Sequence, residues 1–347
     1  MSGDAALPPH IIGMIHLTRR LFIGSALAAT ATRLPAQAGP WDAVADRARS
    51  LDQLHSLIVA RNGTRVVEMA PRGPGLNGLA NVKSVSKTLV AALTGAAIDR
   101  GEITLDTTLA QAAPSLIPTG GDPRVAGLTV RDLVTMRAGL ERTSGANYGG
   151  WVSSGNWVAN ALSRPIVAEP GGRMLYSTGS THVLGAVLAE VTGRSLLDLA
   201  RDWLGQPLAI DIPPWTRDPQ GRYLGGNEMA LSLPAMARFG EMARQGGVWN
   251  GTRVLSADWI ARSFTPVTRS PYSGLSYGYG WFLGTAGGTD YALARGYGGQ
   301  VICVAPRIGL TVVLTSDPLQ PARSGGYFGE IMRLIEGEIL PTARAAA

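Results

Sequence analysis

The chain has 347 residues and a formal net charge of +6, with 45% hydrophobic and 16% charged residues. This composition indicates a globular protein with a sizeable core and excludes an intrinsically disordered chain. The arginines are scattered without a basic run, which argues against a nucleic-acid partner, and the single cysteine, Cys303, excludes an intrachain disulfide and a thiolate metal site.

Residues 1–38 have the features of an export signal. Arg19-Arg20 precedes a mildly apolar stretch over 21–31, and an Ala-x-Ala cleavage site ends at Ala38. The apolar stretch is far shorter than the ~20 residues that span a bilayer, so we expect no stable membrane span. The pattern predicts a twin-arginine signal peptide over 1–38 and a periplasmic or secreted mature protein over 39–347.

The mature chain starts with strands, continues with helices and returns to strands before a last helix. The expected elements are a helix over 41–51, strands over 54–60 and 65–70 around an Asn62-Gly63 turn, helices over 84–100, 130–137, 182–191, 195–203 and 233–244, strands over 277–283, 291–295, 300–305 and 310–316, and a helix over 325–340. This order predicts an α+β fold, in which both ends of the chain build one sheet over about 45–105 and 250–347 and an all-helical part over about 106–249 is inserted. The late strands are too close together for crossover helices, so we expect a mostly antiparallel sheet flanked by helices.

The tetrad Ser84-Val85-Ser86-Lys87 opens the strongest helical stretch. Residues three apart share one face of a helix, so the Ser84 hydroxyl and the Lys87 amine are expected to point the same way. A neutral amine can take the proton of a serine hydroxyl as its oxygen attacks. The chain has only two lysines, Lys83 and Lys87, and arginine cannot act as a base. The alternative interpretation is a solvated Lys87 in a tetrad that arises by chance about once in a chain of this length.

Two later stretches are candidates to complete the site. Tyr176-Ser177-Thr178 comes just before a predicted helix, and a lysine ammonium beside Tyr176 would favour its phenolate form. The run 294–300 is rich in glycine, which lets a backbone edge approach a ligand closely. Alone, the first stretch is better explained by a tyrosine that packs its ring at a helix start, and the second is also typical of a turn between two strands.

Together, the three stretches resemble the motifs of the serine β-lactamase and penicillin-binding-protein superfamily. The chain looks most like the class C branch, with its esterases, D-aminopeptidases and 6-aminohexanoate-dimer hydrolases. The resemblance covers about residues 45–340 and includes further landmarks at 128–140, 169–172 and 277–281. It implies a β-lactamase/DD-peptidase-like fold and no metal or organic cofactor.

The resemblance also implies roles for individual residues. Ser84 would be the acylated nucleophile, Lys87 its base or proton partner, and Tyr176 the second proton-transfer group. The backbone N–H groups of Ser84 and of Tyr297, which follows Gly296, would form the oxyanion hole.

Two departures from the family pattern affect substrate recognition. Thr178 stands where the second motif often has asparagine, so an amide is missing there. Ala294-Arg295-Gly296 stands where the third motif of β-lactamases usually begins with lysine or histidine. Arg295 is the candidate replacement for that cation, unless strand alternation points it elsewhere. These departures favour esterase or amidase activity over β-lactamase activity.

The predicted function is therefore an exported serine hydrolase that acts on a small ester or amide. The alternatives are a β-lactamase or D-Ala-D-Ala carboxypeptidase, and a non-catalytic penicillin-binding-like sensor. The loops 148–156 and 214–226 are expected to select the acyl group, with Trp151, Trp157 and Tyr272 as pocket walls or core residues. The G-x-S-x-G match at 274–278 is excluded as a nucleophile elbow because a β-rich run, not a helix, follows it and no histidine lies beyond it. The oligomeric state is not predicted.

Overall fold

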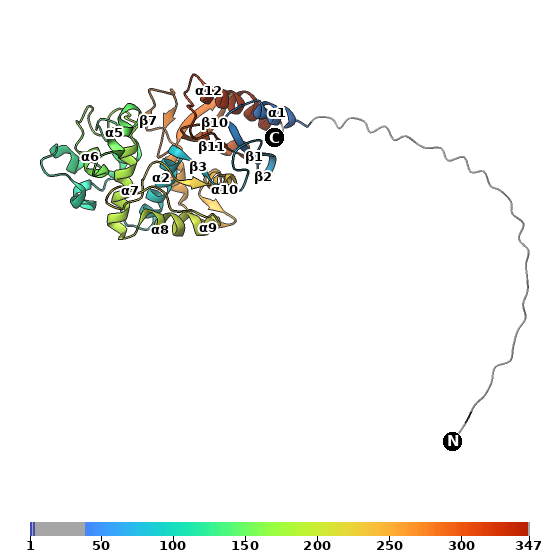
Figure 1. Ribbon diagram of the computed structural model, residues 1–347, viewed down its shortest axis with the longest axis horizontal. Helices are drawn as coiled ribbons and strands as arrows, with labels where there is room; N and C mark the ends of the chain where they lie inside the picture. The colour runs from blue at the N-terminus through green and yellow to red at the C-terminus, as the bar shows by residue number, and fades with distance from the viewer. Residues whose placement is uncertain (2, 4–38, 346–347) are drawn as a thin grey trace, which may run out of the picture. The chain divides into compact units, whose positions relative to one another are not determined.

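Strands from both ends of the chain pair in one eight-stranded antiparallel sheet (Figure 1). The computed structural model describes residues 39–345 together with Met1 and Gly3, so the expected signal peptide otherwise lies outside the described residues. The strand order is β2-β1-β12-β11-β10-β9-β8-β7. The strands of this sheet are β1 Leu54–Arg61, β2 Thr64–Met69, β7 Thr268–Arg269, β8 Ser276–Tyr277, β9 Phe282–Ala286, β10 Thr289–Gly296, β11 Gln300–Ala305 and β12 Leu310–Ser316. The mostly antiparallel sheet predicted from the sequence is confirmed.

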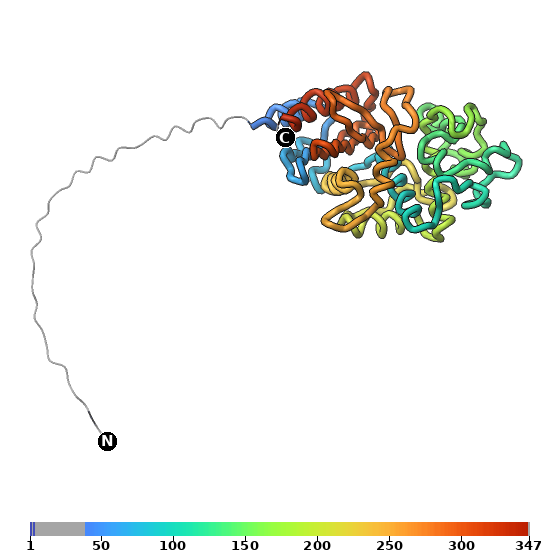
Figure 2. Tube along the Cα trace, turned by 180° about the vertical axis from the view of Figure 1, so that it is seen from behind, coloured from blue at the N-terminus to red at the C-terminus, as the bar shows by residue number. Residues whose placement is uncertain are grey.

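The pairing of β1 with β12 brings residues about 250 to 260 positions apart into register, with Leu54 opposite Ser316. Figure 2 shows the blue N-terminal strands beside the orange and red C-terminal elements. The first hairpin turns at Asn62 and Gly63, with φ of 48° and 81°. A two-residue hairpin turn needs positive φ at both positions, which asparagine and glycine tolerate. The predicted turn is therefore confirmed.

Helices cover both faces of the sheet. On one face lie α1 Asp42–Arg49 and the C-terminal α12 Tyr327–Met332, η7 Arg333–Ile339 and α13 Leu340–Ala345. On the other face lie α2 Ser86–Asp99 and α10 Leu233–Arg244. Side chains of the central strands alternate between the two cores: Val301 and Cys303 face the C-terminal helices, whereas Ile302 and Val304 face α2 and α10. Because both faces are covered, the central strands β11 and β12 are buried along their whole length.

The middle of the chain supplies short helices and long loops. Its elements are α3 Leu109–Ala112, η2 Pro114–Leu116, η3 Pro123–Gly127, α4 Val130–Val134, η4 Gly145–Asn147, α5 Tyr148–Val152, α6 Trp157–Leu162, α7 Thr178–Thr192, α8 Leu196–Ala200, η5 Arg201–Gly205 and α9 Gln206–Leu208. The longest of them, α7, packs against α2, α4 and α6. This packing places the start of α7 beside the start of α2, where two of the candidate motifs lie.

Small elements connect these parts. They are η1 Lys83–Val85, α11 Ala257–Ser263, η6 Pro306–Ile308, and the two-stranded pairs β3 Ala80–Asn81 with β4 Ala230–Leu231 and β5 Val248–Trp249 with β6 Thr252–Arg253. The β3–β4 pair joins the segment before Ser84 to the segment after residue 226. Within the described part of the chain, no helix is both long and apolar enough to cross a membrane.

Some predicted boundaries differ from the structure. The helix expected over 182–191 begins earlier, at Thr178. The N–H groups of Thr178 and Gly179 donate there to serine and threonine hydroxyls of the neighbouring loop 143–144. The helices expected over 195–203 and 325–340 are interrupted by π-helical segments. Ser276 lies in β8 and is followed by β9, which agrees with its exclusion as a nucleophile elbow.

Candidate active site

Ser84 lies in a 3-10 turn, not at the first position of an α-helix as the sequence suggested. The turn η1 precedes α2, which begins at Ser86. It is set up by Asn81, whose side-chain oxygen accepts the N–H of Lys83 at 2.9 Å. Lys83 has φ of +51°, an unfavourable value for a residue with a Cβ. Such strain is found where the surrounding structure fixes a functional residue.

The Lys87 amine is buried against Ser84. Its Nζ donates to Ser84 Oγ at 2.9 Å and to the Gly226 carbonyl oxygen at 2.6 Å. Only 1% of Lys87 is exposed, and no carboxylate forms an ion pair with it in the described residues. Burial disfavours the ammonium and lowers the pKa of Lys87 from 10.5 to about 7. Near neutral pH a large fraction of the amine is therefore unprotonated, as a general base requires.

Tyr176 lies next to this pair, two residues before α7. Its ring centroid lies 5.1 Å from Lys87 Nζ, and its hydroxyl is close enough to Ser84 for that side chain to influence its pKa. Burial raises the pKa of Tyr176 to about 12, against the weaker opposing effects of the Ser84 hydrogen bond and the Arg295 charge. The expectation that a lysine ammonium favours the phenolate is therefore wrong. The lysine is itself half neutral near pH 7, so desolvation of the phenol dominates.

Thr178 belongs to the same site, but its hydroxyl is already engaged. Thr178 Oγ1 lies 2.9 Å from Ser144 Oγ, which also accepts the Thr178 N–H at 2.9 Å. One residue earlier in the loop, Thr143 Oγ1 accepts the N–H of Gly179 at 2.7 Å. The loop thus satisfies N–H groups at the start of α7 and fixes the direction in which the helix leaves Tyr176.

The end of β10 closes the site from the sheet side. A Cβ on Gly296 would lie 2.4 Å from the Val82 carbonyl oxygen, so glycine is needed where this strand passes the Ser84 turn. Tyr297, which follows, is 53% exposed and borders the pocket. The Arg295 guanidinium lies 3.6 Å from the Phe328 ring centroid and donates to Ser324 Oγ at 3.0 Å. Burial lowers the pKa of Arg295 to about 10.

These residues share one pocket of about 630 Å³. The pocket is lined by Lys83, Ser84, Arg142, Ser144, Gly145, Tyr148, Tyr176, Thr178, Asn227, Glu228, Ser270, Tyr272, Ser273, Phe282, Arg295, Gly296, Tyr297, Pro318, Leu319, Ala322 and Ser324. The seven sequence-predicted site residues therefore lie together, six at the pocket wall and Lys87 buried behind Ser84.

Sequence reasoning missed several polar residues of the pocket. Lys83 Nζ pairs with Glu228 Oε1 at 3.1 Å, and Asn227 Nδ2 donates to the Tyr148 hydroxyl at 2.9 Å. Glu228 has φ of +67°, like Lys83 a strained non-glycine residue beside Ser84. Arg142 is held by a cation–π contact with Tyr272, 4.9 Å from the ring centroid. The only sequence signal for them was their proximity to the loops expected to select the acyl group.

The three aromatic residues considered as pocket walls divide into two groups. Tyr272 is 57% exposed and lines the pocket. Trp151 and Trp157 are buried in a small cluster of their own with Leu224 and do not line the pocket. Across the described residues, no three His, Cys, Asp or Glu side chains gather where they could hold a metal ion.

Comparisons with known proteins identify the family and match the fold. A family model described as Beta-lactamase matches residues 55–329. EstCE1, described as a hydrolase with promiscuous acyltransferase activity, is 18% identical with a TM-score of 0.71, over 86% of this chain and 98% of that chain. A penicillin-binding protein homologue from Caulobacter crescentus is 18% identical with a TM-score of 0.70, over 89% of this chain and 98% of that chain. A D-stereospecific amidohydrolase from Streptomyces sp. is 17% identical with a TM-score of 0.67, over 85% of this chain and 98% of that chain. At these identities the solved structures show a shared fold.

Proposed function

Since this chain belongs to the beta-lactamase family, we propose that it is a serine hydrolase that cleaves a small ester or amide through an acyl-enzyme. One observation carries the proposal: the Ser84 hydroxyl is hydrogen-bonded to a buried lysine amine at 2.9 Å. Burial lowers the pKa of that amine to about 7, so it can accept the serine proton at neutral pH.

In the proposed reaction, Ser84 Oγ attacks the substrate carbonyl carbon while Lys87 Nζ takes its proton. The carbonyl oxygen becomes an oxyanion, held by the N–H groups of Ser84 and Tyr297. The bond to the leaving group then breaks, and the departing oxygen or nitrogen receives a proton from Lys87, relayed through the Tyr176 hydroxyl. Water attacks the ester on Ser84, gives its proton to the same groups and releases the carboxylic acid, which restores the serine hydroxyl.

The deciding experiment uses the chain over 39–347, a short activated ester and, separately, a labelled penicillin. We expect turnover of the ester and an acyl adduct on Ser84, located by peptide mass spectrometry. Penicillin trapped on Ser84 without turnover would favour the D-Ala-D-Ala carboxypeptidase or sensor alternative, and fast penicillin hydrolysis would favour β-lactamase. No adduct with either probe would favour a non-catalytic binding protein.

Tyr176 is expected to act as a neutral proton relay. Replacing Tyr176 with phenylalanine removes the hydroxyl beside Ser84 but keeps the ring against Phe282, whose centroid lies 5.9 Å away. We expect kcat to fall about 10²-fold or more, the usual size of a general acid–base contribution, with a small change in KM. Tyr277→Phe removes another buried phenol nearby and serves as the control. An unchanged rate in Tyr176→Phe would reduce Tyr176 to a packing residue.

The charges of the pocket favour a neutral or anionic substrate. Two of the charged residues that line it, Glu228 and Lys83, form an ion pair, so their charges compensate each other. Arg142 and Arg295 also line it, and within residues 39–345 neither forms an ion pair. The altered third motif therefore still presents a cation to the pocket, in Arg295. We propose that this cation holds a carboxylate of the substrate.

Substitution of Arg295 tests this assignment. For Arg295→Gln we expect kcat/KM to fall about 10-fold to 100-fold for an activated ester of a dicarboxylic acid, because a charge-assisted hydrogen bond is lost. The value for the corresponding acetate ester should change little. Arg262→Gln is the control, since Arg262 is 51% exposed and paired with Asp258 outside the pocket. Equal losses for both esters would contradict a role in substrate recognition.

We further propose that the enzyme is exported by its twin-arginine leader and acts in the periplasm or outside the cell. The support is the sequence over 1–38 alone. The mass of the protein recovered from the periplasm should correspond to a chain that begins at Gly39. Recovery of the uncleaved chain from the cytoplasm alone would contradict export.

A further inference from the structure

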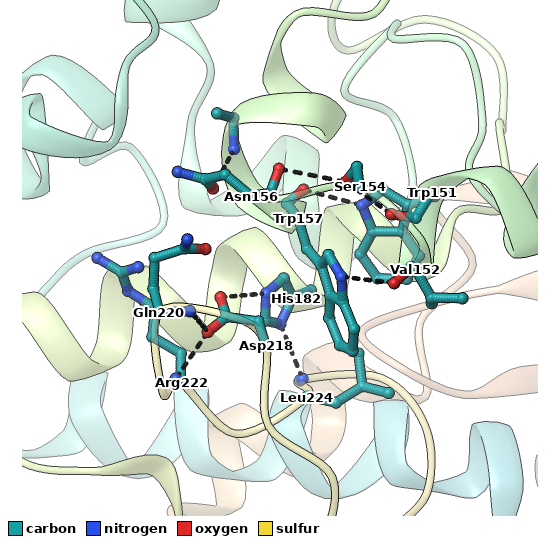
Figure 3. A network of polar contacts seen from close by, with 12 residues as sticks. Trp151, Val152, Ser154, Asn156, Trp157, His182, Asp218, Gln220, Arg222 and Leu224 are labelled. Carbon is teal, nitrogen blue, oxygen red and sulfur yellow. Dashed lines mark hydrogen bonds and ion pairs between the residues drawn. The ribbon is translucent and has the colours of Figure 1, made fainter.

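A buried histidine–aspartate pair joins α7 to the loop 213–226 (Figure 3). His182, on α7, and Asp218, in the loop, both have side chains that are 0% exposed, and His182 Nε2 lies 3.2 Å from Asp218 Oδ2. Asp218 Oδ1 accepts the backbone N–H groups of Gln220 at 3.0 Å and Arg222 at 2.8 Å. Burial opposes the charge of Asp218, but the hydrogen bonds from His182 and from the Arg222 N–H, with the charges of these residues, outweigh it and lower the pKa of Asp218. Because this buried carboxylate accepts two backbone N–H groups of its own loop, it fixes the conformation of the loop.

The histidine has one tautomer that satisfies all its partners. Gly225 N–H points at His182 Nδ1 at 3.3 Å, so Nδ1 must be the acceptor and Nε2 must carry the hydrogen that faces Asp218. The ring packs edge-on against Trp151 and Trp157, with centroid distances of 5.7 and 5.6 Å. Trp151 and Trp157 do not line the pocket, and their contacts with His182 fix the plane of its imidazole ring.

The residue after Gly225 reaches the candidate active site. Gly226 supplies the carbonyl oxygen that accepts from Lys87 Nζ at 2.6 Å. Both glycines press against α7: a Cβ on Gly225 would lie 2.4 Å from the Thr181 carbonyl oxygen, and a Cβ on Gly226 would lie 2.2 Å from the Thr181 hydroxyl. The path from His182 to the Lys87 amine therefore runs through one peptide link and two hydrogen bonds.

We propose that His182 and Asp218 are positioning residues, which hold the Gly225–Gly226 segment against α7 so that the Gly226 carbonyl fixes the Lys87 amine beside Ser84. The inference rests on the proposed role of Lys87 as the base. It assigns α7 a double role, since Tyr176 precedes the same helix. The helix would then fix both proton-transfer partners of the nucleophile.

A loosened loop would change the proton affinity of Lys87 in a definite direction. Burial is the cause of the low pKa of Lys87, so water that enters beside a displaced Gly226 should raise that pKa toward 10.5. The other groups near the amine are the neutral phenol of Tyr176, Arg295 on β10 and the Lys83–Glu228 pair. Within the described residues, neither Tyr176 nor Arg295 is hydrogen-bonded to His182 or Asp218. Glu228 follows Gly226 by two residues, so the Lys83–Glu228 pair would share a displacement of that segment.

The chain offers a direct measurement because it has only two lysines. With ¹³C-labelled lysine, NMR titration should give a midpoint near 7 for Lys87. In His182→Ala we expect this midpoint to rise by about one pH unit or more. The pH at which kcat/KM is half-maximal should rise by the same amount, so that activity lost at pH 7 returns at higher pH.

Asp218→Asn provides a second, nearly isosteric variant. The amide oxygen of the asparagine can still accept the N–H groups of Gln220 and Arg222. Its NH₂ group then faces His182 Nε2, which favours the tautomer with the hydrogen on Nδ1. Nδ1–H would then face the Gly225 N–H, donor against donor, and the Lys87 midpoint should again rise. If His182→Ala does not fold, this variant decides the question alone.

Glu241→Gln is the matched control. Glu241 is another buried carboxylate, bonded to Thr311 at 2.7 Å and to Arg244, but it has no contact with the loop or with Lys87. It should lower thermal stability without moving the Lys87 midpoint. An unmoved midpoint in the folded His182 or Asp218 variants, or an equal shift in Glu241→Gln, would overturn the inference. The titration does not need turnover, so absence of hydrolysis by the unmodified protein would count against the proposed function alone.

Discussion

Replacing Lys87 with arginine is expected to lower kcat/KM by about 10³-fold or more while the protein stays folded. Arginine keeps a positive charge that can donate to Ser84 and to the Gly226 carbonyl, but it does not release its proton and so cannot act as a base. The measurement is the steady-state rate with an activated ester, together with the thermal unfolding midpoint.

Lys83→Arg is the matched control, because Lys83 is the only other lysine and binds Glu228 through an ion pair with a hydrogen bond of 3.1 Å. An arginine can preserve that pair, so the loss should be far smaller than in Lys87→Arg. Near-normal turnover in Lys87→Arg would defeat the proposed mechanism.

The unmodified protein should show the corresponding pH dependence. The neutral amine is the active form, so kcat/KM should rise with pH through about 7. The sign for stability follows from the same pKa: between about 7 and 10.5 the unfolded chain binds a proton at Lys87 that the folded chain does not. The free energy of unfolding contributed by this group therefore increases with pH over that window.

The architecture was accessible from the sequence because its signals are local. The Asn62-Gly63 turn, the apolar runs of the late strands and their short separations were enough to predict a sheet built from both ends of the chain. The interruptions at 201–205 and 333–339 were not accessible. A π-helical segment bonds residue i to residue i+5 and so has a wider turn, but segments of 5 and 7 residues are too short for the apolar pattern to distinguish it from an α-helix.

Some residues of the candidate site could likewise be predicted from the sequence, and others could not. Ser84, Lys87 and Tyr176 carry chemistry that is visible in the residue types and in their order. Glu228 and the His182–Asp218 pair depend on contacts across 36 to 145 positions, which no local pattern specifies. The orientation of Arg295 was likewise open, because strand alternation does not say how a long side chain bends at the end of a strand. The phenolate expectation for Tyr176 failed for a related reason: it counted a nearby charge without knowing how deeply both groups are buried.

Ser84→Ala is expected to abolish both turnover and the acyl adduct, a fall of about 10⁴-fold or more in kcat/KM for a variant that has lost its nucleophile. The fold should be retained, because the hydroxyl faces the pocket and Lys87 keeps its bond to the Gly226 carbonyl. The thermal midpoint should therefore stay close to that of the unmodified protein.

Ser86→Ala should give the opposite result and so controls for the loss of a serine in the same tetrad. Ser86 is fully buried, donates to the Lys83 carbonyl at 2.6 Å and accepts the N–H of Met229 at 3.3 Å. Its removal leaves the Met229 N–H without its partner, while the Lys83 carbonyl keeps the backbone N–H of residue 86, and should lower the free energy of unfolding by about 1–3 kcal/mol. The adduct should still form on Ser84, since that hydroxyl and its lysine remain. Turnover that survives in Ser84→Ala, or an adduct that moves to another residue, would place the reaction outside this tetrad. Loss of activity without loss of stability in Ser84→Ala, and loss of stability without loss of the adduct in Ser86→Ala, would establish that Ser84 is the nucleophile and Ser86 a structural residue.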